Sequence, residues 1–461
     1  MEATLLQDLR KQIDSSRVVD DAESLQTYGR DWTKHFDVKP GAVVFPTSAK
    51  EVAALVKWAR AKKIGLVPSG GRTGLSGGAC ALNGEVVVSF EKMNRVLDFN
   101  QIDRTVTVEA GMVTEALQQY AKEKGFYYPV DFAARGSSQI GGNIATNAGG
   151  VKVLRYGLTR DWVAGLKVVT GAGEILELGG SLVKNATGFD LRHLFVGSEG
   201  TLGFVVEATL RLAAPPKPLT VMVLGVPDLD SVMKVFQVFR DKLPLTAFEM
   251  FSDKALAKVV EHAHLSKPFG TDVPNYLLVE VENTDPAVEE LALSTFESCV
   301  EQGWVVDGAI AQSEAQARDF WRLREDVSEA TSSYSPYKND VSVRISRVPQ
   351  FLKETDEILT KNYPDFEVVW FGHIGDGNMH INILKPANLD KTKFLEKCKH
   401  VNDLLFGVIE KLGGSISAEH GVGLVKKPYL GLSRSVGEID LMKGIKKVFD
   451  PDGVMNPGKI F

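Results

Sequence analysis

Residues 66–78 read Leu-Val-Pro-Ser-Gly-Gly-Arg-Thr-Gly-Leu-Ser-Gly-Gly, and they indicate the fold of the first half of the chain. An apolar strand at 66–68 runs directly into a loop that has five glycines and no acidic residue. Because glycine lets successive backbone N–H groups turn inward, such a loop can bind an anion such as a diphosphate. The loop lacks the Gly-Lys-Ser/Thr of a Walker A sequence, and no Gly-x-Gly-x-x-Gly joins a strand to a helix in the chain.

Two further glycine-rich segments, residues 141–150 and 197–203, occur in the same half of the chain. Each lies beside an expected strand, and we expect both segments to be loops. One such loop alone is more often a plain turn. Three of them in one domain favour a site for a large, phosphate-bearing cofactor.

The elements around these loops predict a mixed α/β half. A helix is expected over 48–65, because Ser48 and Glu51 have the spacing of a capping box and Gly65 follows the last turn. The other expected elements are a strand at 106–110, a helix at 114–124 closed by Gly125, a hairpin over 167–178 and a strand at 203–212.

The segment Ala-Ala-Pro-Pro-Lys-Pro at 213–218 is the clearest domain boundary in the sequence. Beyond it, strands alternate with helices, which predicts an α+β domain with a largely antiparallel sheet. The strands expected there are 220–226 and 276–281, and the helices are 231–240, 286–302 and a long amphipathic one over 313–330. The turn-rich tail at 449–459 is expected to fold back onto the first half.

Composition excludes several classes of protein. The chain has 461 residues, of which 44% are hydrophobic and 24% charged, and a net charge of −6, which is typical of a soluble protein with two or more domains. No basic run suggests a nucleic-acid partner, and no stretch approaches the ~18 apolar residues of a transmembrane helix. The acidic start is unlike a signal peptide, and three scattered cysteines fit a reducing compartment. We therefore expect a cytoplasmic protein.

Residues 371–383, Phe-Gly-His-Ile-Gly-Asp-Gly-Asn-Met-His-Ile-Asn-Ile, place two histidines around a tight reversal of the chain. If the flanking strands pair, His373 and His380 can lie opposite each other, with Asn382 on the same face. A carboxylate and a third imidazole, Glu419 and His420, follow in Ser-Ala-Glu-His-Gly-Val-Gly. From the residues alone, these groups are either part of a metal or catalytic site or ordinary histidines near a turn.

Taken together, the motifs at 68–78, 141–150, 197–203 and 456–459 resemble the FAD-binding domain of the p-cresol methylhydroxylase and vanillyl-alcohol oxidase superfamily. The histidine hairpin and Ala-Glu-His-Gly-Val-Gly resemble its D-2-hydroxy acid dehydrogenase branch. The resemblance implies an α+β fold with a two-part FAD-binding domain of the p-cresol methylhydroxylase type and an α+β substrate (cap) domain. The expected ranges are 1–215 for the FAD-binding domain, 216–415 for the substrate domain with the hairpin, and 416–461 for a segment that packs back on the FAD-binding domain.

The resemblance also implies which residues bind FAD. Members with covalent flavin often carry a histidine in the first loop, whereas this loop has none, so we expect non-covalent FAD. The expected cofactor-binding residues are Pro68, Ser69, Gly70, Gly71, Arg72, Thr73, Gly74, Ser76, Gly77, Gly141, Gly142, Asn143, Thr146, Asn147, Gly149, Gly150, Gly200 and Asn456.

Three more roles follow from the resemblance. His373, His380 and Glu419 are expected to hold a divalent metal, zinc as in the closest relatives, although such a set also accepts manganese, iron or cobalt. His420 is expected to be the base that takes the proton of the substrate hydroxyl while hydride passes to the flavin. Asn382 is expected to orient the substrate.

The choice of hydroxy acid depends on three other residues. Arg324 and Ser328 are four residues apart on the expected long helix and share a face, and Lys338 follows. This pattern is similar to that of members that oxidise D-2-hydroxyglutarate to 2-oxoglutarate, with serine where the animal enzymes have threonine. A guanidinium and an ammonium in one pocket suit a second carboxylate. The alternative is that both are solvated surface charges.

Two rival functions stay open at this point. One is oxidation of D-lactate or glycolate by an enzyme of the same family, and the other is a flavin-binding subunit without turnover of its own. The resemblance implies an electron-transferring flavoprotein as the acceptor of electrons, while the sequence itself is silent on the acceptor. Oligomeric state also stays open, with a homodimer as one arrangement.

Overall fold

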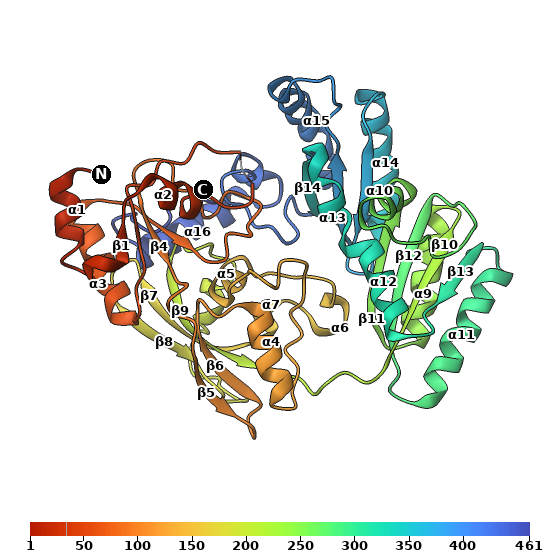
Figure 1. Ribbon diagram of the computed structural model, residues 1–461, viewed down its shortest axis with the longest axis horizontal. Coiled ribbons are helices and arrows are strands. Elements are labelled where there is room, and N and C mark those ends of the chain that lie inside the picture. The colour runs from red at the N-terminus through yellow and green to blue at the C-terminus, as the bar shows by residue number, and fades with distance from the viewer. Residues whose placement is uncertain (34) are drawn as a thin grey trace. The chain divides into compact units, whose positions relative to one another are not determined.

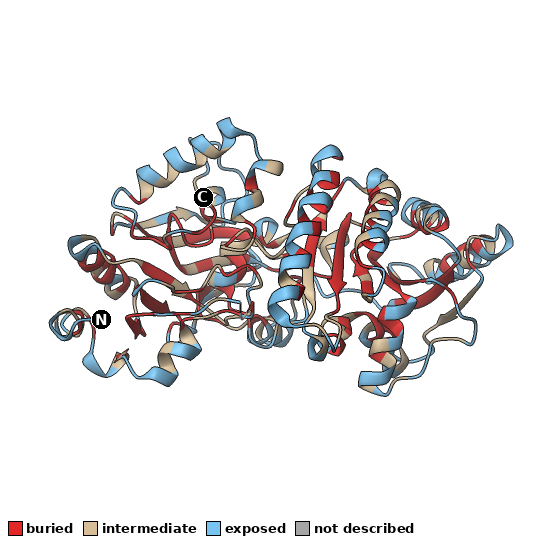
Figure 2. Cartoon of the chain, turned by 90° about the horizontal axis from the view of Figure 1, so that it is seen from above, coloured by how far each residue is buried: buried red, intermediate tan, exposed pale blue. Residues whose placement is uncertain are grey.

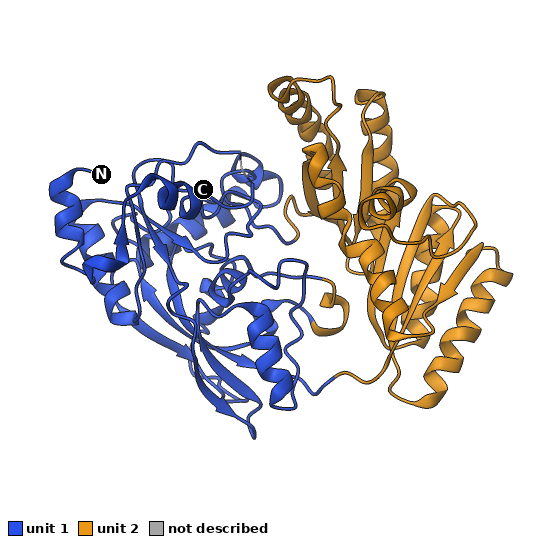
Figure 3. Ribbon diagram, in the orientation of Figure 1, with its two compact units in different colours: residues 1–150, 157–215, 419–461 blue, residues 151–156, 216–418 orange. Residues whose placement is uncertain are grey.

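The proline-rich segment at 213–218 is one of the places where the chain passes from one unit of the structure to the other. The computed structural model describes residues 1–33 and 35–461. Unit 1 comprises residues 1–150, 157–215 and 419–461, and unit 2 comprises residues 151–156 and 216–418 (Figure 3). Unit 1 therefore contains all three glycine-rich segments, and unit 2 contains the histidine hairpin.

Two sheets form the framework of unit 1 (Figure 1). The first has the order β1-β2-β4-β3, in which β2, β4 and β3 are parallel and β1 is antiparallel to β2. The second has the order β5-β6-β9-β7-β8 and is antiparallel throughout. The strands are β1 Val18–Val19, β2 Ala42–Val44, β3 Leu66–Ser69, β4 Val86–Ser89, β5 Val96–Asn100, β6 Thr105–Glu109, β7 Val163–Thr170, β8 Ile175–Gly179 and β9 Gly203–Arg211.

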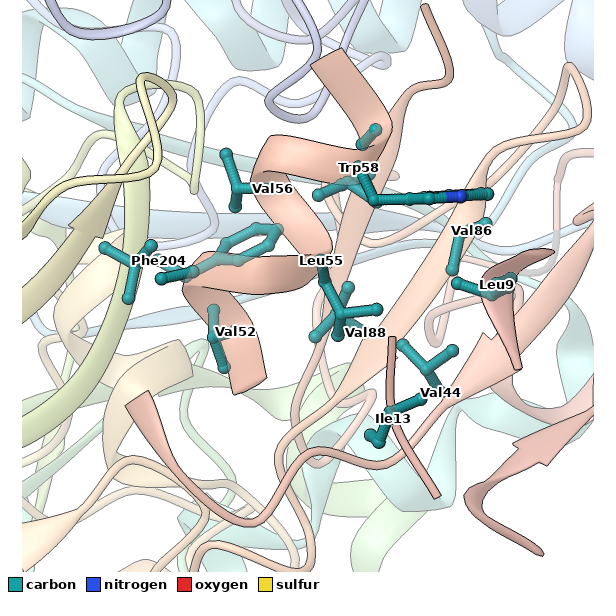
Figure 4. Close-up of a cluster of buried hydrophobic side chains, with 14 of the residues drawn as sticks. Leu9, Ile13, Val44, Val52, Leu55, Val56, Trp58, Val86, Val88 and Phe204 are labelled. Atoms are coloured by element: carbon teal, nitrogen blue, oxygen red, sulfur yellow. The ribbon is translucent and has the colours of Figure 1, made fainter. Parts of the chain in front are cut away.

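The helices of unit 1 pack on these sheets. They are α1 Ala3–Leu9, α2 Ala22–Tyr28, α3 Ala49–Lys62, α4 Thr114–Glu123, α5 Ile140–Thr146, α7 Thr159–Trp162, α8 Arg192–Phe195 and α16 Val436–Phe449. Helix α3 lies over a core that joins both sheets, because its Val52, Leu55 and Val56 pack with Val88 of β4 and Phe204 of β9 (Figure 4). This core holds the start of the first glycine loop, at the end of β3, in a fixed position.

The ends of α3 were predicted only in part. Ser48 caps the helix as expected, with its Oγ accepting the N–H of Glu51 at 3.3 Å. The helix ends at Lys63, which adopts a left-handed φ of 55°, and not at Gly65. A lysine bears this conformation because its N–H still bonds to a carbonyl of the last helical turn.

The prediction of a loop over 141–150 is wrong in its first part. Residues 140–146 form helix α5, which ends where Asn147 adopts a left-handed φ of 52°. Burial explains the helix, because Ile140, Asn143 and Ile144 share one face and are covered by the core. Two glycines in the first turn lower the propensity for helix but do not outweigh that burial.

Unit 2 is built on a single seven-stranded sheet with the order β13-β10-β12-β11-β15-β16-β14. Every pair of neighbouring strands in it is antiparallel, which confirms the predicted sheet type. The strands are β10 Leu219–Val226, β11 Leu245–Ser252, β12 Asn275–Glu282, β13 Asp307–Ile310, β14 Tyr337–Ser342, β15 Val368–Gly372 and β16 Asn378–Ile383. The helices are α6 Val153–Tyr156, α9 Leu229–Lys242, α10 Asp253–Ala263, α11 Pro286–Glu301, α12 Glu314–Glu325, α13 Val327–Ala330, α14 Val348–Asn362 and α15 Lys391–Lys411.

Helices cover both faces of this sheet, with buried residues toward the sheet and exposed residues outward (Figure 2). Helices α10, α12 and α13 pack against the face that carries Phe251 and Phe371. Helix α9 packs against the opposite face, where the rings of Phe236 and Phe248 lie 4.9 Å apart. Side chains that alternate along β11 therefore point to two different layers.

The long helix expected over 313–330 is interrupted. It consists of α12 and α13, with Asp326 between them. The backbone bonds nevertheless continue across the break, since the N–H of Ala330 donates to Asp326 O at 2.8 Å. Among the described residues, no helix is both long enough and apolar enough to cross a membrane.

Candidate functional site: the glycine-rich segments and the histidine hairpin

The first and third glycine-rich segments meet in unit 1. The side chain of Asn456 links them, because its Nδ2 donates to Gly78 O at 2.8 Å and to Glu199 O at 2.7 Å. Gly200 has a φ of +73°, and a Cβ at this position would lie 2.7 Å from the ring of Pro68. The close approach of the two segments therefore requires glycine at this position.

The second segment joins the same cluster. A Cβ on Gly71 of the first loop would lie 1.9 Å from Ser137 O, just before α5. The N–H of Glu199 in the third segment donates to Ala145 O of α5 at 2.8 Å. Three segments that are far apart in the sequence thus lie together in one cluster.

Several predicted cofactor residues have side chains that contact protein groups. The guanidinium of Arg72 lies 4.5 Å above the ring of Tyr28, Asn143 Nδ2 donates to Thr114 Oγ1 at 2.7 Å, and Asn147 Oδ1 accepts the N–H of Arg160 at 3.0 Å. The remaining predicted residues lie on the same three segments: Ser69, Gly70, Thr73, Gly74, Ser76, Gly77, Gly141, Gly142, Thr146, Gly149 and Gly150.

Buried polar atoms in this cluster fit a bound dinucleotide. Ser69 Oγ, Gln139 Oε1 and Asn456 Oδ1 are buried and have no hydrogen-bond partner among the described residues. Burying such atoms without a partner is costly, and the hydroxyl and amino groups of FAD offer partners of the right kind. Gln139 was not among the predicted residues, because it precedes the second glycine segment and belongs to no glycine pattern.

We expect Gly71→Ala to destabilise unit 1 by at least about 2 kcal/mol and to lower its FAD content, because the new methyl group overlaps the backbone of Ser137. Gly444→Ala is the matched control, since a Cβ at this position in α16 meets nothing within 4 Å. The control should raise stability by up to about 1 kcal/mol. Thermal melting and the ratio of flavin to protein absorbance measure both effects. Equal flavin content in the two variants would contradict the expectation.

Glu419 and the residues after it are fixed against the glycine segments of unit 1. The N–H of Gly150 donates to Glu419 Oε1 at 2.6 Å, and Ser76 Oγ donates to Gly421 O at 2.9 Å. The buried carboxylate of Glu199 accepts the N–H groups of Val422 and Gly423 at 2.7 and 2.8 Å. His420 therefore belongs to a segment that is held from both sides.

The pKa of the Glu199 carboxyl group is shifted from its usual value. Burial raises the pKa of its carboxyl group to about 7, although the two N–H bonds that it accepts oppose this rise. Its backbone is left-handed, with a φ of 51°. Glu199 was not a predicted site residue.

In the hairpin of unit 2, the two histidines share one face but are not directly opposite. Residues 374–377 form the turn, and His380 pairs with Phe371 and not with His373. The prediction of opposite positions is wrong because the turn closes between His373 and Asn378, whose N–H donates to His373 O. The two imidazole rings are diagonal neighbours, with centroids 5.5 Å apart and planes at 81°.

A carboxylate stands beside the Nδ1 atom of each histidine. His373 Nδ1 lies 2.9 Å from Glu249 Oε1, which is a hydrogen bond. His380 Nδ1 lies 3.7 Å from Asp340 Oδ1, which is an electrostatic contact. Imidazoles that bind metals are commonly held in this way at one nitrogen, so that the other nitrogen, Nε2, is the ligand atom.

Arg324 is a buried cation on the same face of the sheet. It is 4% exposed, and its Nη2 lies 2.9 Å from Glu249 Oε2. This contact has the distance of an ion pair, but its angle does not make a hydrogen bond. The donors Nε and Nη2 have no hydrogen-bond partner in the part of the chain that the structure describes. A buried guanidinium with two such donors suits a carboxylate ligand.

The other predicted substrate residues lie nearby. Lys338 pairs with Asn382 across β14 and β16, one step along the same face from the pair of Asp340 and His380. Burial lowers the pKa of the Lys338 ammonium below its usual value. Asn382 is buried and donates to Thr331 Oγ1 at 3.2 Å, and Ser328 is half-buried at the start of α13.

The matches to two family models identify the glycine cluster of unit 1 and the antiparallel sheet of unit 2 as parts of a flavin-dependent oxidoreductase. Residues 40–179 match the model of the FAD binding domain, and residues 215–460 match that of the C-terminal domain of FAD linked oxidases. The chain belongs to this family of FAD-linked enzymes.

Two curated proteins are similar over nearly the whole chain. A D-2-hydroxyglutarate dehydrogenase of Stutzerimonas stutzeri (strain A1501) is 60% identical over 460 residues, which cover 100% of this chain and 99% of that protein. A putative mitochondrial D-lactate dehydrogenase of Schizosaccharomyces pombe is 35% identical over 452 residues, 95% of this chain and 85% of that protein. The crystal structure of p-cresol methylhydroxylase with substrate bound matches the fold with a TM-score of 0.78 and 15% identity, over 99% of this chain and 96% of that one.

Proposed function

We propose that this FAD-dependent enzyme oxidises D-2-hydroxyglutarate to 2-oxoglutarate with the help of a divalent metal. The observation that carries the proposal is the face of unit 2 on which two histidines, each with a carboxylate at Nδ1, lie beside the buried Arg324. Such a face offers ligands for a metal and a cation for a carboxylate within one layer. The name of the relative from Stutzerimonas stutzeri supports the same substrate.

His373, His380 and Glu419 are the proposed metal ligands, because each offers one ligand atom of a type that zinc takes. Ser415 pairs with Ser342 at the end of β14. Glu419 follows four residues later, and an extended chain of that length spans at most about 14 Å from Ser415. A divalent metal bound there would lower the pKa of a substrate hydroxyl. Zinc is the proposed ion, and manganese, iron or cobalt would suit the same ligands.

The residues of the chain then have separate roles. Arg324, Ser328 and Lys338 would bind the substrate carboxylate, and Asn382 would orient the hydroxy acid. His420 would take the hydroxyl proton as the C2–H bond breaks and a C2=O double bond forms. FAD, when bound to the glycine cluster, accepts the hydride. The two-electron balance is complete without another reactant.

Oxidation of D-lactate is the second candidate, because the similar protein of Schizosaccharomyces pombe is named for that substrate. Lys338 distinguishes the two candidates, since a partly buried ammonium is favourable only when a second carboxylate meets it. Glycolate has a single carboxylate, as lactate does, so glycolate oxidation belongs with the lactate candidate. A flavin-binding subunit without turnover would not need Glu249 and Asp340 beside the Nδ1 atoms of the two histidines.

We expect Lys338→Ala to raise KM for D-2-hydroxyglutarate by about tenfold or more, because an ion pair with the substrate is lost. Activity on D-lactate should change little, since lactate has no second carboxylate. Anaerobic bleaching of the flavin by each acid measures both. Equal losses for the two acids would contradict the dicarboxylate assignment, and a flavin that no 2-hydroxy acid bleaches would favour the subunit without turnover.

An electron-transferring flavoprotein is the proposed acceptor for the reduced flavin, and a homodimer is the proposed assembly. Cys80, Cys299 and Cys398 are buried and unpaired, which suits a reducing compartment such as the cytoplasm.

A further inference from the structure

Glu249 is a buried carboxylate in the middle of β11 to which sequence reasoning gave no role. It is 2% exposed and lies on the face of the sheet that α10, α12 and α13 cover. Backbone pairing fixes its position, because Met250 pairs with Gly372 and the N–H of Gly375 donates to Phe248 O at 3.0 Å. The turn of the histidine hairpin is therefore held directly against the strand that carries Glu249.

One carboxylate serves two functional groups. Glu249 Oε1 and Oε2 lie 2.9 and 2.8 Å from His373 Nδ1, and Oε2 also lies 2.9 Å from Arg324 Nη2. The guanidinium also lies 5.0 Å above the ring of Phe371. A buried guanidinium without an anionic partner would be strongly unfavourable, so Glu249 fixes both the charge balance and the direction of Arg324.

We propose that Glu249 is a positioning residue that couples the metal site to the carboxylate-binding site, an inference that rests on the proposed function. Its carboxylate selects the tautomer of His373 that presents Nε2, and the same group orients Arg324 through Oε2. Because both contacts come from one rigid group on a central strand, the two sites keep a fixed separation. That separation sets which hydroxy acids can bind the metal and Arg324 together.

Glu249→Gln tests the coupling, because the neutral amide loses the negative charge that balances Arg324 and turns one of the two acceptor atoms into an N–H donor. Zinc affinity, measured by competition with a chelator, should fall about 10–100-fold. With zinc saturating, KM for D-2-hydroxyglutarate should still rise, while kcat and the KM for D-lactate change less. Glu249→Asp keeps both oxygens on a shorter chain and should retain more zinc affinity than Glu249→Gln.

Glu280→Gln is the matched control. Glu280 is a buried carboxylate on β12 of the same sheet, but it accepts the indole N–H of Trp321 and pairs with Lys152. This control should lose thermal stability and keep the zinc affinity of the wild type. If Glu249→Gln fails to fold, the zinc affinity of Glu249→Asp is compared with that of Glu280→Gln. A weaker affinity in Glu249→Asp supports the coupling, and an equal affinity contradicts it.

Two results would overturn the inference in different ways. A folded Glu249→Gln that binds zinc as tightly as a zinc-binding wild type overturns the coupling alone. A wild type that binds no divalent metal overturns the proposed function, and the coupling with it.

Discussion

Replacing His420 with alanine should lower kcat by about 10²–10⁴-fold, because the hydroxyl proton then has no positioned base as hydride leaves C2. The fold and the bound flavin should survive, since the hydrogen bonds between the side chains of Ser76 and Glu199 and the backbone of residues 421–423 do not involve the imidazole. The measurement is the rate of anaerobic flavin reduction after rapid mixing with D-2-hydroxyglutarate.

His400→Ala is the control for this experiment, because His400 is an exposed residue of α15. It should reduce its flavin at the rate of the wild type. A His420→Ala protein with a normal flavin spectrum and a normal rate of reduction would show that another group accepts the proton.

Removal of the metal with a chelator should lower turnover by about 100-fold or more, because the ion is expected to supply several kcal/mol of stabilisation to the developing charge. FAD should remain bound, since His373 and His380 belong to unit 2 and the bond from the Gly150 N–H to Glu419 does not need the ion. Added zinc should restore the activity of the wild type.

His380→Ala should show the low activity of the metal-free protein and should not recover with zinc at the concentration that restores the wild type. The experiment measures metal content and flavin content together with turnover. Full turnover in a protein shown to be metal-free would mean that the histidines of the hairpin serve another purpose.

Local signals in the sequence were enough to place several elements. Ser48 begins α3, Gly125 ends α4 with a φ of +79°, and β6 and β9 begin and end within two residues of the expected positions. These signals lie within a few residues of the structure that they determine, so no long-range information is needed. The family resemblance supplied the fold, which the domain matches and the antiparallel cap confirm.

Features that depend on distant contacts could not be predicted. Helix α5 forms because Ile140 and Ile144 are buried, and a segment rich in glycine does not show this burial in advance. Glu249 is 124 residues from His373 in the sequence and stands in an ordinary strand pattern. The side chains of Gln139 and Glu199 likewise gain their surroundings only when the segments meet. The roles of the metal ligands, of His420 and of the substrate residues stay predictions.

The order in which the chain is synthesised has a consequence for unit 1. Every residue of unit 2 has been synthesised once Ala418 is added, whereas unit 1 needs residues 419–461. The missing part is structural, because Met455 bridges to Leu66 at β3 and Lys459 Nζ donates to Cys80 O at 2.7 Å. Unit 2 can therefore fold while unit 1, the flavin-binding unit, still lacks its last contacts. During translation, the nascent unit 1 depends longest on protection from aggregation.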